Sequence, residues 1–327
     1  MVVVWRVTQR CNLGCEFCGY DRRLPWARRD ADPEQILAFG AVLADFQRVT
    51  GRRILVSWLG GEPMLWRPLA ELTTSFVREF GLRVSATTNG STLGSPDVRA
   101  HVLEHYAELT VSVDAVGRPH DDLRAWRGGF AHLRRSVGAL AAEKARAGAG
   151  PLLRANVVLM RHTVADFPAL CRELSRWGVE EITFNRLGGS DRPEFYPAHS
   201  LTLPQVRWLS AEVPVLRDEL RRSGVALRGG PRYLERIEHS AAGRALPVAD
   251  CHPGNEFLFV NEAGLVAPCS FTLDGYGVSV DSLRSAHDLG ALAQRFRVAR
   301  DRHRLLVCDD CPSTHVFAKF AVDADGS

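Results

Sequence analysis

The sequence has little lysine, little net charge and no long apolar run. No stretch approaches the roughly 18 apolar residues needed to span a membrane. The N-terminus becomes polar too soon to be a secretory signal. We therefore predict a cytoplasmic protein with no membrane partner. In that reducing compartment the eight cysteines are expected to bind metal rather than to form disulfides.

The charges nearly cancel, since 41 basic residues face 38 acidic residues and the formal net charge is +3. A dedicated nucleic-acid binder usually carries a concentrated basic face, so we predict no nucleic-acid partner. Arginine greatly outnumbers lysine. We interpret that imbalance as a reflection of genome composition more than of function.

Short β-branched runs alternate with amphipathic helical patterns over the first 190 residues. The runs are largely apolar, as strands covered on both faces should be. Six such units predict an α/β fold, a partial TIM-like (β/α)6 barrel of parallel strands. The expected strands are Val2–Thr8, Ile54–Trp58, Leu82–Ala86, Leu109–Val113, Leu152–Leu159 and Glu181–Phe184.

The remainder of the chain changes character. Residues 191–245 are expected to form a helical connection, with a helix at 204–223. Residues 246–320 are expected to form a small α+β domain that contains a β-hairpin (257–260 and 265–267) and a helix near 285–300. The last residues, 321–327, are expected to be a disordered tail.

Cys11, Cys15 and Cys18 follow directly on the first expected strand. This places three thiolates at the carboxyl end of a barrel strand, where barrel active sites form. Three closely spaced thiolates suit one face of a cubane iron–sulfur cluster and leave the fourth iron open for a ligand. The alternative is a structural zinc site, which usually has four ligands. No fourth Cys or His lies nearby in the sequence.

The Cys-x3-Cys-x2-Cys pattern, with Phe17 before its last cysteine, resembles the signature of the radical S-adenosylmethionine (SAM) superfamily. Further matching segments follow the later strands in order, over roughly residues 1–190. The resemblance implies a [4Fe–4S] cluster on the three cysteines and SAM bound beside it. It implies SAM contacts from Gly60, Gly61, Glu62, Pro63, Thr88, Asn89, Ser112, Asp114, Asn156 and Leu187. A protein that only stores clusters would not need these segments.

A second set of cysteines, Cys251, Cys269, Cys308 and Cys311, lies in the last quarter of the chain. The pattern resembles the auxiliary-cluster domains called SPASM and twitch. It is closer to the shorter twitch form, because no cysteine follows Cys311. Four cysteines would fully ligate a second [4Fe–4S] cluster. A four-cysteine zinc ribbon is the alternative.

A fully ligated second cluster suits electron transfer, and the resemblance points to dehydrogenases of aminocyclitols and sugar alcohols in antibiotic biosynthesis. We therefore expect an oxidoreductase that converts a carbinol of a small-molecule substrate to a ketone, with the second cluster as electron acceptor. The electron donor would be a flavodoxin or ferredoxin. The alternatives are a peptide-modifying enzyme, a sugar epimerase and a sugar-acid decarboxylase. The peptide alternative is disfavoured here because the first strand begins at Val2, with no recognition domain before it.

Two side chains are the candidates for catalysis. Arg186, just past a strand end, could hold a substrate oxygen or phosphate. His252 could serve as a proton acceptor, or it could support the second cluster. Further polar candidates for the substrate mouth are Asn185, Asp191, Arg192, Asn255 and Glu256. Cys171, on the apolar face of a helix, is expected to be a buried, inert thiol.

Overall fold

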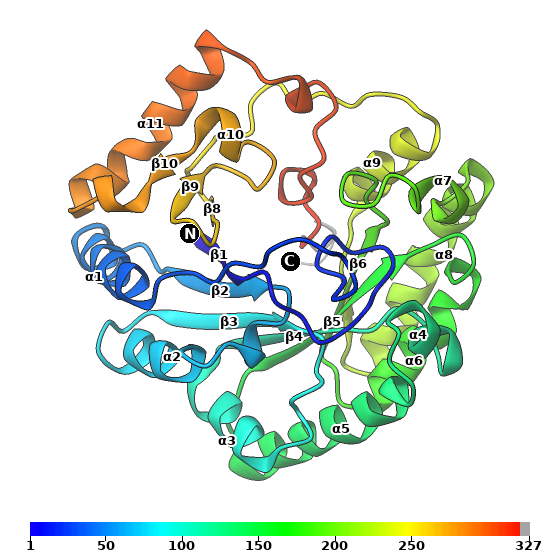
Figure 1. The fold of residues 1–327 in the computed structure, drawn as a ribbon. Helices are drawn as coiled ribbons and strands as arrows, with labels where there is room; N and C mark the ends of the chain where they lie inside the picture. Colours follow the sequence, from blue (N-terminus) through cyan, green and yellow to red (C-terminus); the bar gives the residue numbers. More distant parts are fainter. Residues whose placement is uncertain (321–327) are drawn as a thin grey trace.

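The computed structural model describes residues 1–320, so the predicted tail at 321–327 lies outside the described residues. Six parallel strands joined by crossover helices form the first part of the chain, which confirms the predicted α/β class (Figure 1). All six predicted strands are present, with ends shifted by at most two residues. They pair in chain order: β1 (Val2–Thr8), β2 (Leu55–Gly60), β3 (Arg83–Thr88), β4 (Glu108–Ser112), β5 (Leu152–Leu159) and β6 (Glu181–Arg186).

Helices cover the outer face of these strands (Figure 1). The first of them begins where the Asp32 side chain accepts a hydrogen bond from the amide of Glu34, and it ends at Gly51, whose φ of 70° suits glycine. Its apolar face packs on the sheet through buried residues such as Phe39 and Leu43. The helices are α1 (Pro33–Thr50), α2 (Leu69–Arg78), α3 (Pro96–His105), α4 (Arg118–Leu123), α5 (Gly129–Ala147) and α6 (Phe167–Arg176).

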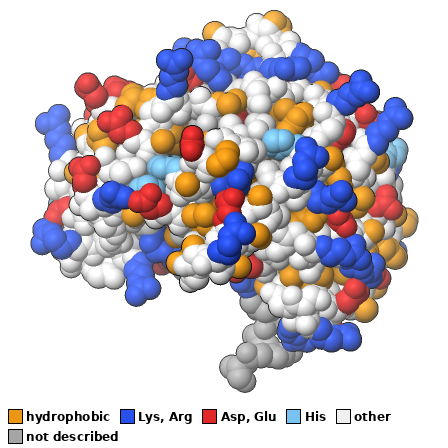
Figure 2. All heavy atoms as spheres, turned by 90° about the horizontal axis from the view of Figure 1, so that it is seen from below, with side chains coloured by type: hydrophobic (Ala, Val, Ile, Leu, Met, Phe, Trp, Pro, Cys, Tyr) orange, Lys and Arg blue, Asp and Glu red, His pale blue; other side chains and the backbone are white. Residues whose placement is uncertain are grey.

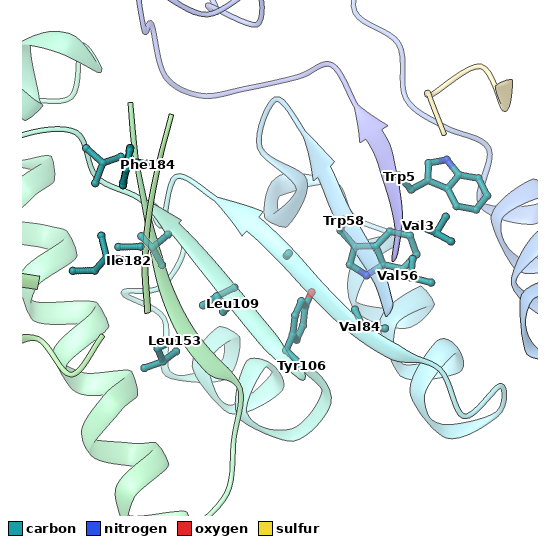
Figure 3. Packing of buried hydrophobic residues seen from close by; sticks show 14 of the residues in the cluster. Val3, Trp5, Val56, Trp58, Val84, Tyr106, Leu109, Leu153, Ile182 and Phe184 are labelled. Carbon is teal, nitrogen blue, oxygen red and sulfur yellow. The ribbon is translucent and has the colours of Figure 1, made fainter. Parts of the chain in front are cut away.

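The outward-facing side chains of the strands form the hydrophobic core. Figure 3 shows them following the sheet from Trp5 on β1 and Trp58 on β2 to Phe184 on β6. The two tryptophans are fully buried, with ring centroids 6.5 Å apart. Because side chains alternate along a strand, the residues between these apolar ones point toward the inside of the open barrel.

The inner face of the strands is polar, which corrects the expectation that the strands are apolar on both faces. Along β5, Leu153, Ala155 and Val157 are buried beneath the helices, whereas Arg154 and Asn156 are half-buried on the opposite face. Side chains alternate along a strand, so an open barrel packed on one face only presents the other face to its interior.

The chain continues beyond β6 through α7 (Tyr196–His199), α8 (Leu203–Arg222), β7 (Ala226–Leu227) and α9 (Pro231–Ala241). The sequence predicted α8 and gave no signal for α7, β7 or α9. The short strand β7 extends the sheet beside β6, with Ala226 paired to Glu181. Helix α9 then turns back toward the open side of the barrel (Figure 1).

The C-terminal strands join the same sheet at its other edge. Strand β8 (Phe257–Val260) pairs in parallel with β1, with Val2 opposite Phe257. The predicted hairpin is present, because β9 (Leu265–Ala267) returns antiparallel to β8 and is followed by α10 (Leu273–Tyr276) and β10 (Val278–Ser279). Helix α11 (Ala286–Arg302) packs beside α1. One ten-stranded sheet therefore runs from β10 to β7.

Residues 312–320, which we call the closing segment, cross the gap between the two edges of this sheet. At one side the His315 ring stacks on Phe257 of β8, with ring centroids 4.5 Å apart. In the middle Phe317 is buried beneath the guanidinium of Arg236 from α9. At the far side Lys319 reaches Asn156 on β5. The closing segment thus forms a wall of the barrel interior.

The surface carries charges of both signs, interspersed over the face shown in Figure 2. Within residues 1–320, no helix combines the length and the apolar character needed to cross a membrane.

Candidate active site

The loop after β1 carries Cys11, Cys15 and Cys18 and is folded by its own backbone. The amide of Cys18 donates to the carbonyl oxygen of Cys15 at 3.0 Å. The amides of Leu13 and Tyr20 point at the sulfurs of Cys11 and Cys18, at 3.5 and 3.4 Å. Hydrogen bonds of this kind to cysteine sulfur are one means by which proteins tune iron–sulfur clusters. The donor set and its amide partners therefore fit the predicted cluster.

Burial raises the pKa of Cys15 to about 12 and that of Cys18 to about 11. The guanidinium of Arg124 opposes this effect on both thiols. Cluster irons bind thiolates, so iron must displace protons from these buried sulfurs. A nearby fixed positive charge favours the thiolate form and offsets part of the negative charge that a bound cluster brings.

Arg124 is a residue that the sequence analysis missed. It follows α4 and is buried, and its Nε donates to Asp114 Oδ2 at 2.8 Å. Its guanidinium also lies over the Phe17 ring at 5.8 Å. Nothing in the sequence motif marks it, because the loop that carries it comes to the cysteines only in the folded chain. The other oxygen of Asp114 accepts from the amide of Val158 at 2.9 Å. Asp114, predicted to lie near the SAM ribose, therefore has both oxygens occupied inside the protein.

Gly60 and Gly61 are required for close backbone packing. A Cβ on Gly60 would lie 2.4 Å from the carbonyl oxygen of Thr8, and one on Gly61 would lie 2.2 Å from that of Arg10. The amide of Gly61 donates to Thr8 and the amide of Glu62 to Arg10, at 2.9 and 2.8 Å. These two hydrogen bonds fasten the segment after β2 to the start of the cysteine loop.

Glu62 connects the second and third strand ends. Its buried carboxylate accepts hydrogen bonds from Thr88 Oγ1 and from the amide of Asn89, both at 2.6 Å, and from the amide of Met64 at 3.1 Å. Burial raises the pKa of Glu62 to about 7, although these three donors favour the ionised form. The adjacent Pro63 opens a short 3-10 turn and is also buried. Glu62 therefore holds two predicted SAM-contact segments in one arrangement.

Asn89 extends the same network to the cysteine loop. Its Nδ2 donates to Asn12 Oδ1 at 2.9 Å and lies 3.8 Å from the sulfur of Cys11. The segments after β1, β2 and β3, far apart in the sequence, thus form one connected group of polar side chains. The structure brings together the predicted residues Cys11, Glu62, Thr88 and Asn89 in this way.

Ser112, Asn156 and Thr183 lie at one level across β4, β5 and β6, because Asn156 is paired to both of the others. The Asn156 amide oxygen accepts from Thr183 Oγ1 at 3.0 Å and from Asn185 Nδ2 at 3.2 Å. This level lies on the inner face. Leu187, the last predicted SAM contact, is buried just past β6, where its amide donates to the carbonyl of Leu159.

Arg186 points toward α9 and the second cysteine region, since Arg236 and Asp310 are among its charged neighbours. Burial lowers the pKa of Arg186. Its Nη1 donates to the carbonyl of Leu187 at 3.2 Å. Asp191 and Arg192 instead come close to the first cysteine loop: the former lies against Gly19 and the latter is 3.4 Å from Asp21.

His252, Asn255 and Glu256 lie away from this site. Strand β8 starts level with the first residue of β1, so the residues before it belong to the amino-terminal edge of the sheet. Glu256 pairs there with Arg52 at 2.9 Å, and that guanidinium also takes the carbonyl of Asn255. The His252 side chain is 68% exposed and faces Asp250 at 3.2 Å. These placements correct the expectation that the three residues border the substrate mouth beside β5 and β6.

The second cysteine set gathers at that same amino-terminal edge. Burial and the neighbouring thiols of Cys269, Cys251 and Cys308 together raise the pKa of Cys311 to about 11. Cys269 also contacts Thr272 Oγ1 at 3.4 Å. Cys171, by contrast, is fully buried on α6 in the hydrophobic core.

Within residues 1–320, no three His, Cys, Asp or Glu side chains surround a point as the ligands of a single metal ion do.

Comparison with known proteins gives one family and two groups of relatives. A family model described as the Radical SAM superfamily matches residues 5–174, more than half of the chain. The PqqA peptide cyclase of Xanthomonas euvesicatoria pv. vesicatoria (strain 85-10) is 26% identical over 334 residues, which cover 96% of this chain and 80% of the cyclase. The Fe-coproporphyrin III synthase of Methanosarcina barkeri (strain Fusaro / DSM 804) is 26% identical over 63% of this chain and 49% of that protein.

Solved structures resemble the fold over nearly the whole chain. Streptococcus suis SuiB bound to its precursor peptide SuiA matches 97% of this chain and 70% of that chain, with a TM-score of 0.66 and 15% identity. Native anSMEcpe with bound AdoMet matches 95% of this chain and 88% of that chain, with a TM-score of 0.64 and 15% identity. The likeness therefore includes the C-terminal strands as well as the barrel.

Proposed function

The chain belongs to the radical SAM superfamily, and from that premise we propose that it modifies a peptide by radical chemistry. It is an enzyme that uses SAM and [4Fe–4S] clusters, as its family does. The peptide was the alternative in the sequence analysis. The comparisons favour it over the small sugar-like substrate that the sequence analysis placed first.

One observation carries the choice of substrate class. The likeness to the PqqA peptide cyclases covers 96% of this chain, so it includes the region of the four C-terminal cysteines. The likeness to the Fe-coproporphyrin III synthase covers only 63%. The PqqA peptide cyclases, which match nearly the whole of this chain, are named for acting on a peptide.

Cys11, Cys15 and Cys18 would hold the first cluster, and the network of Glu62 and Asn89 would fix the walls around it. When bound, the cluster supplies the electron that splits SAM into methionine and a 5′-deoxyadenosyl radical, which removes a hydrogen atom from the substrate. Arg124 offsets negative charge at the cysteines, and Asp114 holds it in place. Ser112 and Asn156, on the inner face, would orient the nucleoside.

The inner face and the closing segment would then surround the substrate. Arg154 pairs with Glu108 at 2.9 Å and also with Glu181, so its guanidinium is fixed on the floor of the barrel interior. Ordered polar groups of this kind hold a substrate in a reactive position. The closing segment keeps water from the open side of the barrel, which protects a radical from side reactions.

The four C-terminal cysteines would hold a second [4Fe–4S] cluster that accepts an electron from the substrate. On this proposal the modification is oxidative, and the peptide loses two hydrogen atoms in forming a new bond. Arg300 lies beside Cys251, and its Nε is buried without a protein partner within residues 1–320. The guanidinium also pairs with Asp250 at 3.8 Å, and an anionic cluster would add an acceptor for the unpartnered Nε.

The test is to reconstitute the protein anaerobically and to incubate it with SAM, a reductant and two panels of compounds. One panel holds the short peptides encoded beside its gene, and the other holds aminocyclitols and sugar alcohols. We expect a peptide to accelerate formation of 5′-deoxyadenosine and to lose two hydrogen atoms by mass spectrometry.

The matched control is the Cys308→Ala/Cys311→Ala double variant, which should cleave SAM but leave the peptide unoxidised. Oxidation of an aminocyclitol or sugar alcohol, with every peptide unchanged, would restore the small-molecule hypothesis.

A further inference from the structure

Lys319, in the closing segment, is one of only two lysines among the 41 basic residues of the chain. The other, Lys144, forms an ion pair with Glu180 at 2.5 Å. Lys319 is 6% exposed, and within residues 1–320 no carboxylate oxygen lies within ion-pair distance of its Nζ. Nearly all basic residues of this chain are arginines, yet the basic residue at this buried position is a lysine.

The amine reaches the level predicted to hold SAM. Its Nζ donates to Asn156 Oδ1 at 3.0 Å, the same oxygen that accepts from Thr183 and Asn185. All three donors point at the amide oxygen of Asn156, so the orientation of that side chain is fixed by groups from β6 and the closing segment. Lys319 is therefore attached to the polar inner face of β5 rather than to the protein surface.

The charged side chains near the amine come from β4, β5, β6 and the segment after β7. Arg154 from β5 is paired with Glu108 from β4 and with Glu181 from β6. Arg228, after β7, takes the second oxygen of Glu181 at 2.6 Å. The ring of Phe320 lies 5.2 Å from the amine. The carboxylates in this group are already matched by arginines, so they do little to hold a proton on Lys319.

The amine is consequently easy to deprotonate. Burial and, to a smaller extent, Arg154 lower the pKa of Lys319 to about 7, although Glu181 opposes them. An arginine at this position would stay charged at any physiological pH, whereas a buried lysine can serve as a base. At this position a lysine can therefore do what an arginine cannot, which is to give up and accept a proton near neutral pH.

We propose that Lys319 is the proton-accepting residue of the reaction chamber. After the hydrogen atom has been removed, the substrate radical loses one electron to an iron–sulfur acceptor and one proton to the neutral amine of Lys319. The new substrate bond closes, and the amine becomes an ammonium. The proton transfer rests on the proposed oxidative function. The placement of a titrating Lys319 amine beside the SAM pocket is independent of that function.

The scarcity of lysine gives a direct experiment. The cluster-loaded protein, labelled with 13Cε-lysine, should show two lysine signals by NMR, and Lys144→Arg assigns them by removing one. We expect the Lys319 signal to titrate near pH 7 and to shift when S-adenosylhomocysteine is added as a non-cleavable probe. The Lys144 signal should stay unmoved by the probe. Titration of Lys319 at its ordinary pKa of about 10.4, or no response to the probe, would overturn the placement.

The catalytic part is tested with the modified peptide as readout. Wild-type product formation should fall as pH drops through about 7, because the amine is then already protonated. Lys319→Arg keeps the charge, Lys319→Met keeps the shape, and both should lose product across the whole pH range while retaining both clusters by iron content. Product with an unchanged pH profile in either variant would refute the base. If no peptide reacts, the peptide proposal fails, and the two NMR results still decide the placement.

Discussion

The two cysteine sites of this chain are built in opposite ways. The first uses three cysteines within one loop at the carboxyl end of β1, and local amides bind two of its sulfurs. The second draws Cys251 from before β8, Cys269 from after β9, and Cys308 and Cys311 from after α11. All three cysteines of the first site lie in a single loop of the barrel. The second is drawn from three separate segments, so a cluster bound there would also link them.

The sites also lie at opposite edges of the sheet. Strand β1 ends at the first site and begins level with the second, and at about 3.3 Å per residue its seven residues separate them by roughly 20 Å. The closing segment and the inner face lie between them. Chemistry that starts at one site and sends an electron to the other therefore has the chamber on its route.

The largest effect should come from the first site. Replacing Cys11, Cys15 and Cys18 together by Ala should abolish SAM cleavage, because no other described thiols are placed to hold that cluster. The variant should keep roughly four irons, as one cubane on four cysteines requires. Iron content and 5′-deoxyadenosine assays check this. Retained cleavage would contradict the assignment of the first site. Complete loss of iron would mean that the C-terminal cysteines hold no cluster in this variant.

Substituting the second site should separate cleavage from product. The Cys308→Ala/Cys311→Ala variant should still form 5′-deoxyadenosine, since the first loop makes its own hydrogen bonds. It should also show faster amide hydrogen exchange in β8, β9 and the closing segment, because it loses a link between them. Exchange rates equal to those of the wild type would mean that the second site is not structural.

Arg124→Met should weaken the first site without removing it. It leaves the Asp114 carboxylate buried and unpaired, which costs about 3–5 kcal/mol of unfolding free energy. It also removes a positive charge beside the cysteines, so the midpoint potential of the first cluster should fall. A redox titration followed by electron paramagnetic resonance measures this shift. Because the sites are far apart, the potential of the second cluster should stay the same, which serves as the internal control.

The smallest effect is a pH dependence that belongs to neither site. Lys319 has a lowered pKa when folded, so the unfolded chain binds more protons between about pH 7 and about pH 10.4. Its contribution to stability therefore rises with pH across that window. Lys319→Met should flatten this part of the stability profile. Thermal midpoints of the two proteins, compared at several pH values, give the difference, and parallel profiles would argue against the lowered pKa.

The repeating elements could be predicted from the sequence, because strand length and apolar periodicity are local properties. The strands β1 to β6, the hairpin of β8 and β9, and both cysteine sets follow from patterns of a few residues. Arg124 and Lys319 do not, since each gains its meaning from partners on distant segments. The polar inner face was missed for a related reason. A half-buried residue such as Arg154 is conspicuous only once the helices are known to cover one side of the sheet.

The misplaced residues teach the same point. His252, Asn255 and Glu256 were expected beside the substrate, because the second region was assumed to follow β6 at the active-site edge. The parallel pairing of β8 with β1 sends them to the other edge. The partner of a strand and its direction depend on the whole sheet, so no local motif reveals them.

The pairing of β1 with β8 also has a consequence for folding during translation. Val2 leaves the ribosome early, but its partner Phe257 emerges only after most of the chain has been made. Until then one edge of β1 stays unpaired, and such an edge invites pairing with other chains. Contacts between residues so distant in sequence also slow folding. Interrupted translation near residue 250 should therefore yield aggregates, even though the barrel strands and the first cysteine loop are already complete.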